Sequence, residues 1–381
     1  MVLSDVTLTR AMPYSVVSNI GKENIPMDEK SIASLRGTQK LSLDARVIEQ
    51  AARSGCTRYR TAVSAGISPD NLSIAVYGDS SGDNGISPFA RAIGIAFEHW
   101  LIDKDAFAMK EAYDLMAGWR PEIVENFIDL LDSNNLAEAE ARTAEVIDRR
   151  IKTGEGPNLI FGARLSLVTA SGVAHVRPDM LIARPGWKHF RVGEIKSYLD
   201  LDGRTDGTEI GKAVRQASVG IVAMRQNFGV DSTEDEVDLI LRVARNPGAT
   251  VRTLDAGVEV SSIMEFISLV PKEIKDALEI TGGLTLSSKK SLEKIPHRFE
   301  PACKGACALY ESCHTEAIAN DELSLLGPNA ESALEGVSGL SRAIELASGA
   351  IPLNEEEERV APSLVASWEM SESLEKEYPI S

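Results

Sequence analysis

The chain is poor in the residues that build disulfide frameworks and histidine metal sites. Its 381 residues include 4 cysteines and 5 histidines, and only 5% are aromatic. In a reducing compartment, so few cysteines are more often metal ligands or free thiols than disulfide partners. His175, His189 and His297 have no partner at ligand spacing, so we expect them to be core or surface residues. The cysteines are therefore the residues to examine first.

Long apolar runs and leader patterns are also missing. The sequence turns polar at Ser4 and Asp5, and no apolar run approaches the roughly 20 residues that a membrane helix needs. No phosphate-binding Walker loop is present, so we expect no ATP hydrolysis by this chain, and any helicase would be a separate partner. These absences predict a cytoplasmic protein that binds no membrane.

Positive charge is in deficit, with 40 Lys and Arg against 57 Asp and Glu, a net charge of −17. This argues against a broad DNA-coating surface, because phosphate binding depends on Lys and Arg. Residues 184–215 nevertheless hold seven Lys and Arg against five acids, and Arg53, Arg58 and Arg60 surround Cys56. The pattern is compatible with a narrow basic groove, although a chance fluctuation in charge would look the same.

Hydrophobic periodicity indicates an α/β protein. It predicts helices over 42–65, 88–100, 105–151 (with a break at 118–121), 210–226, 263–280 and 316–350. It predicts strands over 158–168, 174–182, 190–198, 237–244 and 250–260. Strands in the middle with helices on both sides favour an α/β core. We expect an irregular segment at 1–40 and a loop over 69–83.

A carboxylate pair followed by a lysine is the first candidate for chemistry. Glu194 and Lys196 share one face of a predicted strand, and Asp179 stands in the strand before it. A hairpin turn at Pro185-Gly186 would bring Asp179 beside Glu194. Two close carboxylates stay ionised best with a cation between them, and hard oxygen ligands suit Mg²⁺ or Mn²⁺. A surface hairpin carrying an ordinary ion pair is the alternative.

Pro178-Asp179 followed by Glu194-Ile195-Lys196 resembles the PD-(D/E)XK nuclease superfamily, in its RecB-like branch. The resemblance implies a restriction-endonuclease-like core, with a central mixed β-sheet flanked by helices, that hydrolyses phosphodiester bonds in DNA. It implies metal binding by Asp179, Glu194 and the backbone carbonyl of Ile195. Lys196 would orient or deprotonate the attacking water, or stabilise charge on phosphorus.

Two further positions fit the pattern of this branch. Gly94 and Glu98 match an upstream helix motif that supplies another metal ligand, with His99 as the neighbouring alternative. Gln216 matches a glutamine on the helix after the Glu-x-Lys strand and would help to position the DNA. The aromatic residue often found four positions later is Gly220 here, which weakens the assignment of a DNA-positioning helix. Glu98 alone would also suit a solvated helix face.

The cysteines are split into one early residue, Cys56, and three late ones, Cys303, Cys307 and Cys313. This split does not match the paired knuckles of zinc fingers, whereas ligation by four cysteines suits a 4Fe–4S cluster. It resembles the iron-staple nucleases of the same branch, in which one cysteine precedes the core and three follow it. The spacing from Cys303 to Cys307 is one residue longer than usual, which leaves zinc, or ligation by His314, open. Four buried free thiols are the remaining alternative.

The predicted organisation has four parts: an N-terminal arm over 1–40, a nuclease domain closed by the cysteines over 41–315, a helical piece over 316–353 and a loosely ordered acidic tail over 354–381. Within the helical piece, Gly336 and Gly339 resemble the glycines of a helix–hairpin–helix that binds DNA phosphate. Ordinary helix connections look the same.

The sequence therefore predicts a metal-dependent deoxyribonuclease, an exonuclease more than an endonuclease, for single-stranded or end-containing DNA in repair, recombination or phage defence. A 4Fe–4S cluster would staple it, and a helicase or a defence-complex protein would be a partner. Two alternatives stay open: a catalytically inactive subunit that binds DNA or protein, and a zinc-stabilised module of another function.

Overall fold

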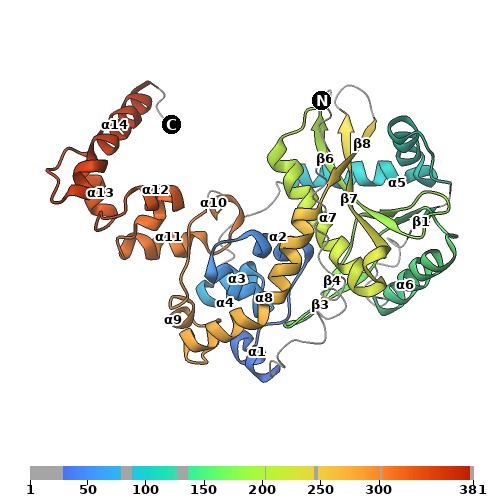
Figure 1. The fold of residues 1–381 in the computed structure, drawn as a ribbon, viewed down its shortest axis with the longest axis horizontal. Helices are drawn as coiled ribbons and strands as arrows, with labels where there is room; N and C mark the ends of the chain where they lie inside the picture. Colours follow the sequence, from blue (N-terminus) through green and yellow to red (C-terminus); the bar gives the residue numbers. More distant parts are fainter. Residues whose placement is uncertain are drawn as a thin grey trace, which may run out of the picture.

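In the computed structural model, the described residues are 29–78, 88–122, 124–126, 136–201, 203–243, 248–300 and 303–377. Within these ranges a six-stranded mixed sheet lies at the centre (Figure 1). Its spatial order is β1 (Val124–Asn126), β2 (Leu159–Phe161), β5 (Met180–Ile182), β6 (Phe190–Asp200), β7 (Thr233–Val243) and β8 (Ala249–Asp255). The pairs β1/β2 and β6/β7 are parallel and the others antiparallel. The expected α/β class, a mixed sheet flanked by helices, is confirmed at this level.

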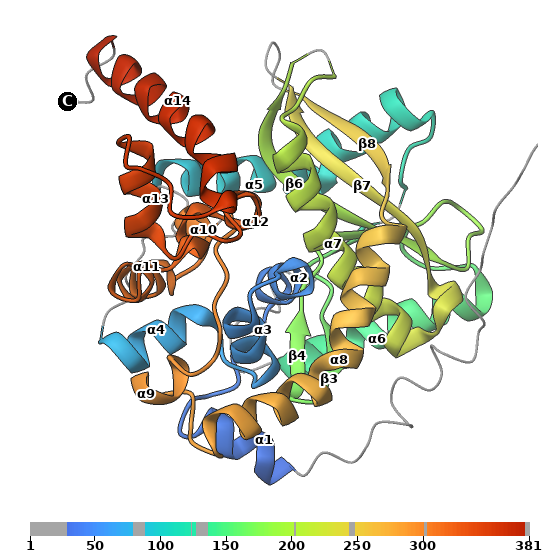
Figure 2. The same ribbon diagram turned by 60° about the vertical axis from the view of Figure 1, so that its left-hand side comes forward.

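Helices cover both faces of the sheet. The longer ones are α2 (Ala45–Arg53), α3 (Thr57–Ser64), α4 (Pro69–Tyr77), α5 (Pro88–Ala117), α6 (Leu136–Thr153), α7 (Gly207–Phe228), α8 (Gly257–Thr281), α11 (Tyr310–Ala319) and α14 (Glu355–Glu377). Helix α5 lies on one face, and α7 and α8 lie on the other (Figures 1 and 2). Asp206 caps α7 by accepting the N–H groups of Thr208 and Glu209 at 2.8 and 3.2 Å. None of the helices in the described ranges is both long and apolar enough to cross a membrane.

Close packing explains why a glycine, and no aromatic residue, stands at position 220. Gly220 lies in the buried part of α7, and a Cβ there would stand 3.2 Å from both Pro178 and Val192. The helix therefore approaches the β5 and β6 strands more closely than a larger residue would allow. The departure from the pattern has a structural cause beside the candidate site.

Two predicted strands are wrong in their extent, because each is divided. The segment 158–168 forms β2 and then β3 (Leu165–Thr169), and 174–182 forms β4 (Gly172–Val176) and then β5. The β3 and β4 strands pair only with each other, as a separate hairpin. Pro178 lies at the second break, where the missing N–H of proline interrupts a ladder. The strand predicted over 250–260 ends at Asp255, and α8 follows.

Two segments predicted to be irregular contain helices. Residues 29–36 form α1 (Glu29–Arg36), with Ile32 and Leu35 buried, whereas 1–28 lie outside the described residues. Within 69–83, helix α4 begins at Pro69 and is capped by Ser68, while 79–83 lie outside the described residues. In each case a buried apolar stripe or a cap outweighs the local turn-forming composition.

The segment 354–381 is mainly helix α14 and is not a loose tail; only 378–381 lie outside the described residues. Its glutamates at 355–358 form the first turn, where the positive end of the helix dipole favours negative charge. Val360 and Ala361 are buried against α13 (Leu340–Ala347). The helix predicted over 42–65 is also divided, into α2 and α3, and Cys56 is the residue that precedes α3.

Candidate active site and cysteine cavity

The β5 and β6 strands form the hairpin that places the first two carboxylates. They pair antiparallel with Met180 opposite Gly193, so Asp179 and Glu194 lie next to each other at one end of the β5 strand. The turn is at the predicted position, with Gly186 at φ +79°. The N–H of Ile195 donates to Asp179 Oδ2 at 2.8 Å. The expected juxtaposition of Asp179 and Glu194 is present.

Lys196 lies against Glu194 and against helix α7. Its Nζ is 2.6 Å from Glu194 Oε1 and donates to Gln216 Oε1 at 3.1 Å. Residues two apart on a strand share a face, and α7 covers this face of the sheet. Lys196 therefore contacts both Glu194 and Gln216, and Asp179 lies beside Glu194. The structure brings these four predicted residues together.

Glu98 reaches the same group from α5. It is half-buried, and its charge interacts with those of Asp179 and Lys196. Its neighbour His99 is exposed on the helix. Gly94, one turn earlier, lies close to Ser197, so the first turns of α5 pass beside the end of the β6 strand.

The site carries more negative charge than its lysine balances. Burial, together with the charges of Asp179 and Glu98, raises the pKa of Glu194 to about 8. Burial also raises the pKa values of Asp179 and Glu98 above their ordinary range. Burial opposes the charge of Lys196, yet Glu194 and Asp179 hold its pKa above its ordinary value. Either protons or a bound cation must compensate the excess of carboxylates.

Proximity is not the same as coordination. Across the residues that the structure describes, no group of three or more His, Cys, Asp or Glu side chains is arranged to hold a metal ion. At Glu194 the ammonium group of Lys196 already takes the position beside one carboxylate oxygen. A divalent cation at this site would require the side chains around Glu194 to turn.

The four cysteines gather in a second place. Cys56, Cys303 and Cys307 line a cavity of about 100 Å³, between the start of α3 and the short helix α10 (Cys303–Ala306). Cys313, from α11, is buried and interacts electrostatically with Cys56 and Cys307. The early cysteine and the three late ones, far apart in sequence, are therefore neighbours in the fold.

Hydrogen-bond donors point at two of these sulfur atoms. The N–H of Glu300 donates to Cys303 Sγ at 3.2 Å, and Nη1 of Arg58 donates to Cys313 Sγ at 3.3 Å. Burial raises the pKa of Cys313 to about 11, against the opposing effect of Arg58, and raises that of Cys307 further. Donors favour a thiolate and burial favours a thiol, a conflict that metal binding would resolve.

Arg58 is the residue whose role here the sequence did not reveal. It is only 1% exposed and binds the carboxylate of Glu316 at 2.7 and 2.9 Å as well as the carbonyl of Ile295 at 3.0 Å. The sequence showed it as one of three arginines around Cys56, in a run that resembles the entry motif of the iron-staple nucleases. Its position two residues after that cysteine was the available signal, but its partners lie more than 200 residues away along the chain.

Helix α7 connects the two places. Lys212 lines the cysteine cavity, and Gln216, one turn further, is hydrogen-bonded to Lys196. Between them, Arg215 lies 3.4 Å from the buried carboxylate of Glu49 on α2. A movement of α7 at the cysteine cavity would therefore also move Gln216 relative to Lys196.

The suggested helix–hairpin–helix is not suited to phosphate. Helices α12 (Pro328–Ala333) and α13 flank the two glycines, as expected. Asp321 Oδ1, however, accepts the backbone N–H of Ser341 at 2.6 Å and its hydroxyl at 2.7 Å. A Cβ on Gly339 would also collide with Asp321. A carboxylate occupies the position that a phosphate would need, so the geometry of this hairpin argues against binding of DNA phosphate here.

Comparison with known proteins gives no assignment: no family model matches the chain, and no curated protein matches it. Any function assigned to the chain therefore depends on these side chains and their geometry.

Proposed function

We propose that this chain is a metal-dependent deoxyribonuclease with a PD-(D/E)XK-type core, which cleaves single-stranded or end-containing DNA, as an exonuclease rather than an endonuclease. The observation that carries the proposal is the meeting of Asp179, Glu194 and Lys196 across the β5/β6 hairpin, with Gln216 closing over Lys196 from α7. Surface ion pairs are seldom so buried: Glu194 is 2% exposed.

The donor set fits Mg²⁺ or Mn²⁺. Asp179, Glu194 and the carbonyl of Ile195 would hold the ion, with Glu98 as a further oxygen ligand. When bound, the ion would polarise a phosphate oxygen and lower the pKa of an attached water. Three crowded carboxylates with raised pKa values, against the charges of Lys196 and Arg177, leave negative charge for a cation to neutralise.

Lys196 has a narrower role than the sequence allowed. Without a metal, burial opposes the charge of Lys196, but Glu194 and Asp179 hold its pKa above its ordinary value. A protonated amine donates hydrogen bonds and does not take a proton from water. We therefore assign it to stabilising negative charge on the phosphate, and Gln216 to holding its ammonium group in place.

For the cysteines we propose a 4Fe–4S cluster with a structural role, on the chemistry of four thiol groups, although their side chains in the described structure are not arranged around a metal. Cys56, Cys303, Cys307 and Cys313 would hold it and would supply the four thiolates that such clusters need. Bound there, it would join the start of α3 to α10 and α11. Zinc remains the competing occupant, and colour separates them because 4Fe–4S proteins are brown.

Cleavage of end-labelled single-stranded DNA in Mg²⁺ or Mn²⁺ tests the proposal. Lys196→Ala and Asp179→Asn should each lower the rate by about 100-fold or more, since each removes charge stabilisation at the reacting phosphate. Lys290→Ala, at an exposed lysine on α9 (Lys289–Leu292), is the matched control and should retain full activity. Equal residual cleavage in all three variants would point to a contaminating nuclease.

A second candidate is a nuclease-like subunit that binds DNA or a protein partner, such as a helicase or a defence-complex protein, without cleaving. Two observations favour it: the net charge of −17 and the lack, among the described residues, of three side chains arranged around a metal. Wild-type protein that stays inert with several metals and substrates, yet shifts DNA in a gel, would support this candidate.

A further inference from the structure

Two arginines lie opposite each other beside the candidate metal site. The β2/β5 pair and the β3/β4 pair follow one continuous antiparallel register. Between them the N–H of Gly162 donates to the carbonyl of Asp179 at 3.4 Å. This register places Arg164 opposite Arg177, between the central sheet and the β3/β4 hairpin. Like charges at opposite positions of an antiparallel pair are destabilising, unless an anion lies between them.

Neither arginine has a carboxylate partner of its own. Arg164 is half-buried and Arg177 is exposed, and among the described residues neither guanidinium group forms an ion pair or a hydrogen bond. Burial lowers the pKa of Arg164, and the charge of Arg177 lowers it further. Glu140 on α6 opposes this effect, but its carboxylate lies 2.6 Å from His175 Nδ1. The fold therefore neutralises the positive charge of the two arginines only in part.

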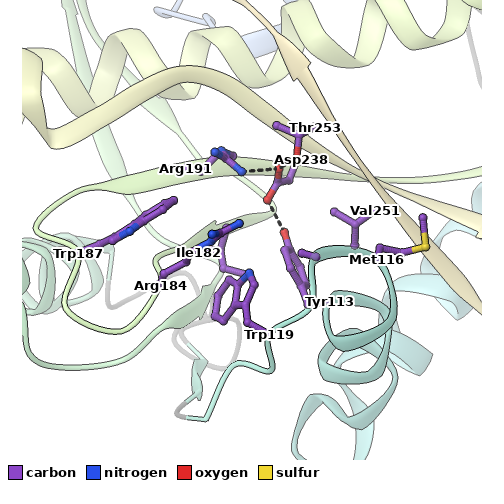
Figure 3. Close-up of a pocket in the computed structure, with 11 residues that line it drawn as sticks. Tyr113, Met116, Trp119, Ile182, Arg184, Trp187, Arg191, Asp238, Val251 and Thr253 are labelled. Carbon is purple, nitrogen blue, oxygen red and sulfur yellow. Dashed lines mark hydrogen bonds and ion pairs between the residues drawn. The ribbon is translucent and has the colours of Figure 1, made fainter.

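Arg191, on the β6 strand, shows the contrasting arrangement. Its guanidinium group lies 2.5 Å from Glu234, 2.6 Å from Glu236 and 3.3 Å from Asp238. Asp238 also accepts a hydrogen bond from Tyr113 Oη at 2.7 Å (Figure 3). These contacts satisfy the guanidinium group within the fold, and the two facing arginines have no such network.

Arg177 stands directly beside the candidate metal ligands. It precedes Asp179 by two residues, and its charge acts on the carboxylates of Asp179 and Glu98. A divalent cation at those carboxylates would compensate them in its place and leave Arg177 to another anion. In the proposed reaction, a DNA strand at that cation brings several phosphates to this part of the surface.

We infer that Arg164 and Arg177 together hold one phosphate of the DNA strand, beside the phosphate that is cleaved; the inference rests on the proposed function. Guanidinium groups donate forked pairs of hydrogen bonds that match phosphate oxygens, and a phosphate between two of them relieves their repulsion. The two arginines would keep the strand in register with the cation without touching the reacting atoms. They are positioning residues.

Binding of a fluorescein-labelled oligothymidylate to the full chain tests the inference. Anisotropy is measured in Ca²⁺ over a range of KCl concentrations, and a gel shows that the strand stays intact. Arg164→Gln is the decisive variant, because Arg177→Gln also changes the charge beside Asp179. We expect Arg164→Gln to weaken binding about tenfold, as the loss of a charge-assisted hydrogen bond should. The slope of log affinity against log salt should become less steep by about 0.7, the share of one phosphate on a single strand.

Three controls separate this role from a structural one. Arg359→Gln, at an exposed arginine on α14, loses the same charge and should bind DNA as the wild type does. Arg164→Lys keeps the charge but loses the fork, so it should restore the salt slope and only part of the affinity. The melting temperature of Arg164→Gln and its affinity for Mn²⁺ should not fall, because the substitution removes one of two facing charges.

Strands with phosphate or hydroxyl ends, labelled at the other end, identify the phosphate. It is internal if Arg164→Gln weakens binding of all strands, and terminal if only strands with a phosphorylated end are affected. A wild type that does not bind DNA, or an Arg164→Gln variant with the affinity and salt slope of the wild type, would overturn the inference. Cleavage in Mg²⁺ or Mn²⁺ is scored separately. An inert wild type whose DNA binding still depends on Arg164 would count against the proposed function alone.

Discussion

At the scale of single residues, the decisive feature is a glutamate held among like charges. Glu194 is buried beside Asp179 and Glu98, and the charges of Lys196 and Arg177 offset these carboxylates only in part. Its pKa of about 8 means that, without a metal, the folded protein holds a proton on this group that the unfolded chain has already released. In the metal-free protein, the unfavourable free energy of placing an ionised Glu194 in this site therefore grows as pH rises.

This cost predicts how stability varies with pH. Between about pH 5 and pH 8 the folded state binds one more proton at Glu194 than the unfolded state, so stability falls as pH rises through that window. Glu194→Gln has no such proton. Its stability relative to wild type should therefore improve with pH by at most about 1.4 kcal/mol per pH unit. Urea unfolding of metal-free protein across this window measures it, and a constant difference would refute the assigned pKa.

The sequence predicts this site because three of its residues lie close together along the chain. Asp179, Glu194 and Lys196 lie on two strands joined by one short turn, so alternation and a turn signal were enough to place them together. The network of Tyr113, Arg191 and Asp238 was not predicted. Its members come from three elements, and no spacing in the sequence marks a contact between α5 and the β7 strand.

At the scale of elements, errors arose where tertiary packing overrides local composition. Segment 69–83 looked like a loop because it opens with a proline and holds three aspartates, yet Pro69 suits the first turn of a helix and Ser68 caps it. The strand over 174–182 looked continuous because its apolar pattern crosses Pro178, where the chain passes from the small hairpin to the central sheet. Long helices such as α7 and α8 were found because their apolar period is sustained.

Arg58 ties two of these elements together. From α3 it binds Glu316 and Cys313, both on α11, while being almost fully buried. Arg58→Met would leave Glu316 without its partner and should lower the free energy of unfolding by about 3 kcal/mol. Arg60→Met, two residues on, breaks a more exposed pair with Glu273 and should cost about 1 kcal/mol. Equal losses in urea unfolding would contradict a special role for Arg58.

At the scale of the whole molecule, the cysteines join the beginning of the fold to its end. Cys56 precedes the central sheet in the chain and Cys303, Cys307 and Cys313 follow it, so a cluster on all four closes a very long loop. Closing such a loop removes conformational entropy from the unfolded chain, and the free energy of metal binding adds to that of folding.

Anaerobically purified protein should therefore be brown, with a broad absorption band and roughly four iron and four sulfide per chain. Cys307→Ala should lose the colour and most of the iron and should unfold at a lower temperature. It should also cleave DNA more slowly, because Lys212 and Gln216 lie one turn apart on α7. Colourless wild-type protein with one zinc would replace the cluster with a zinc site, and a metal-free protein would leave four thiols.

If Asp179 and Glu194 hold a divalent cation, the protein must bind Mn²⁺ at these carboxylates, and this can be measured before any substrate is known. Titration of the wild-type protein with Mn²⁺, followed by calorimetry and by electron paramagnetic resonance, should give one site at neutral pH that binds more tightly as pH rises, because Mn²⁺ competes with the proton on Glu194. Asp179→Asn and Glu194→Gln should abolish that site, and Lys290→Ala should keep it. Saturable binding that persists in both carboxylate variants, or no binding to the wild type, would contradict the account.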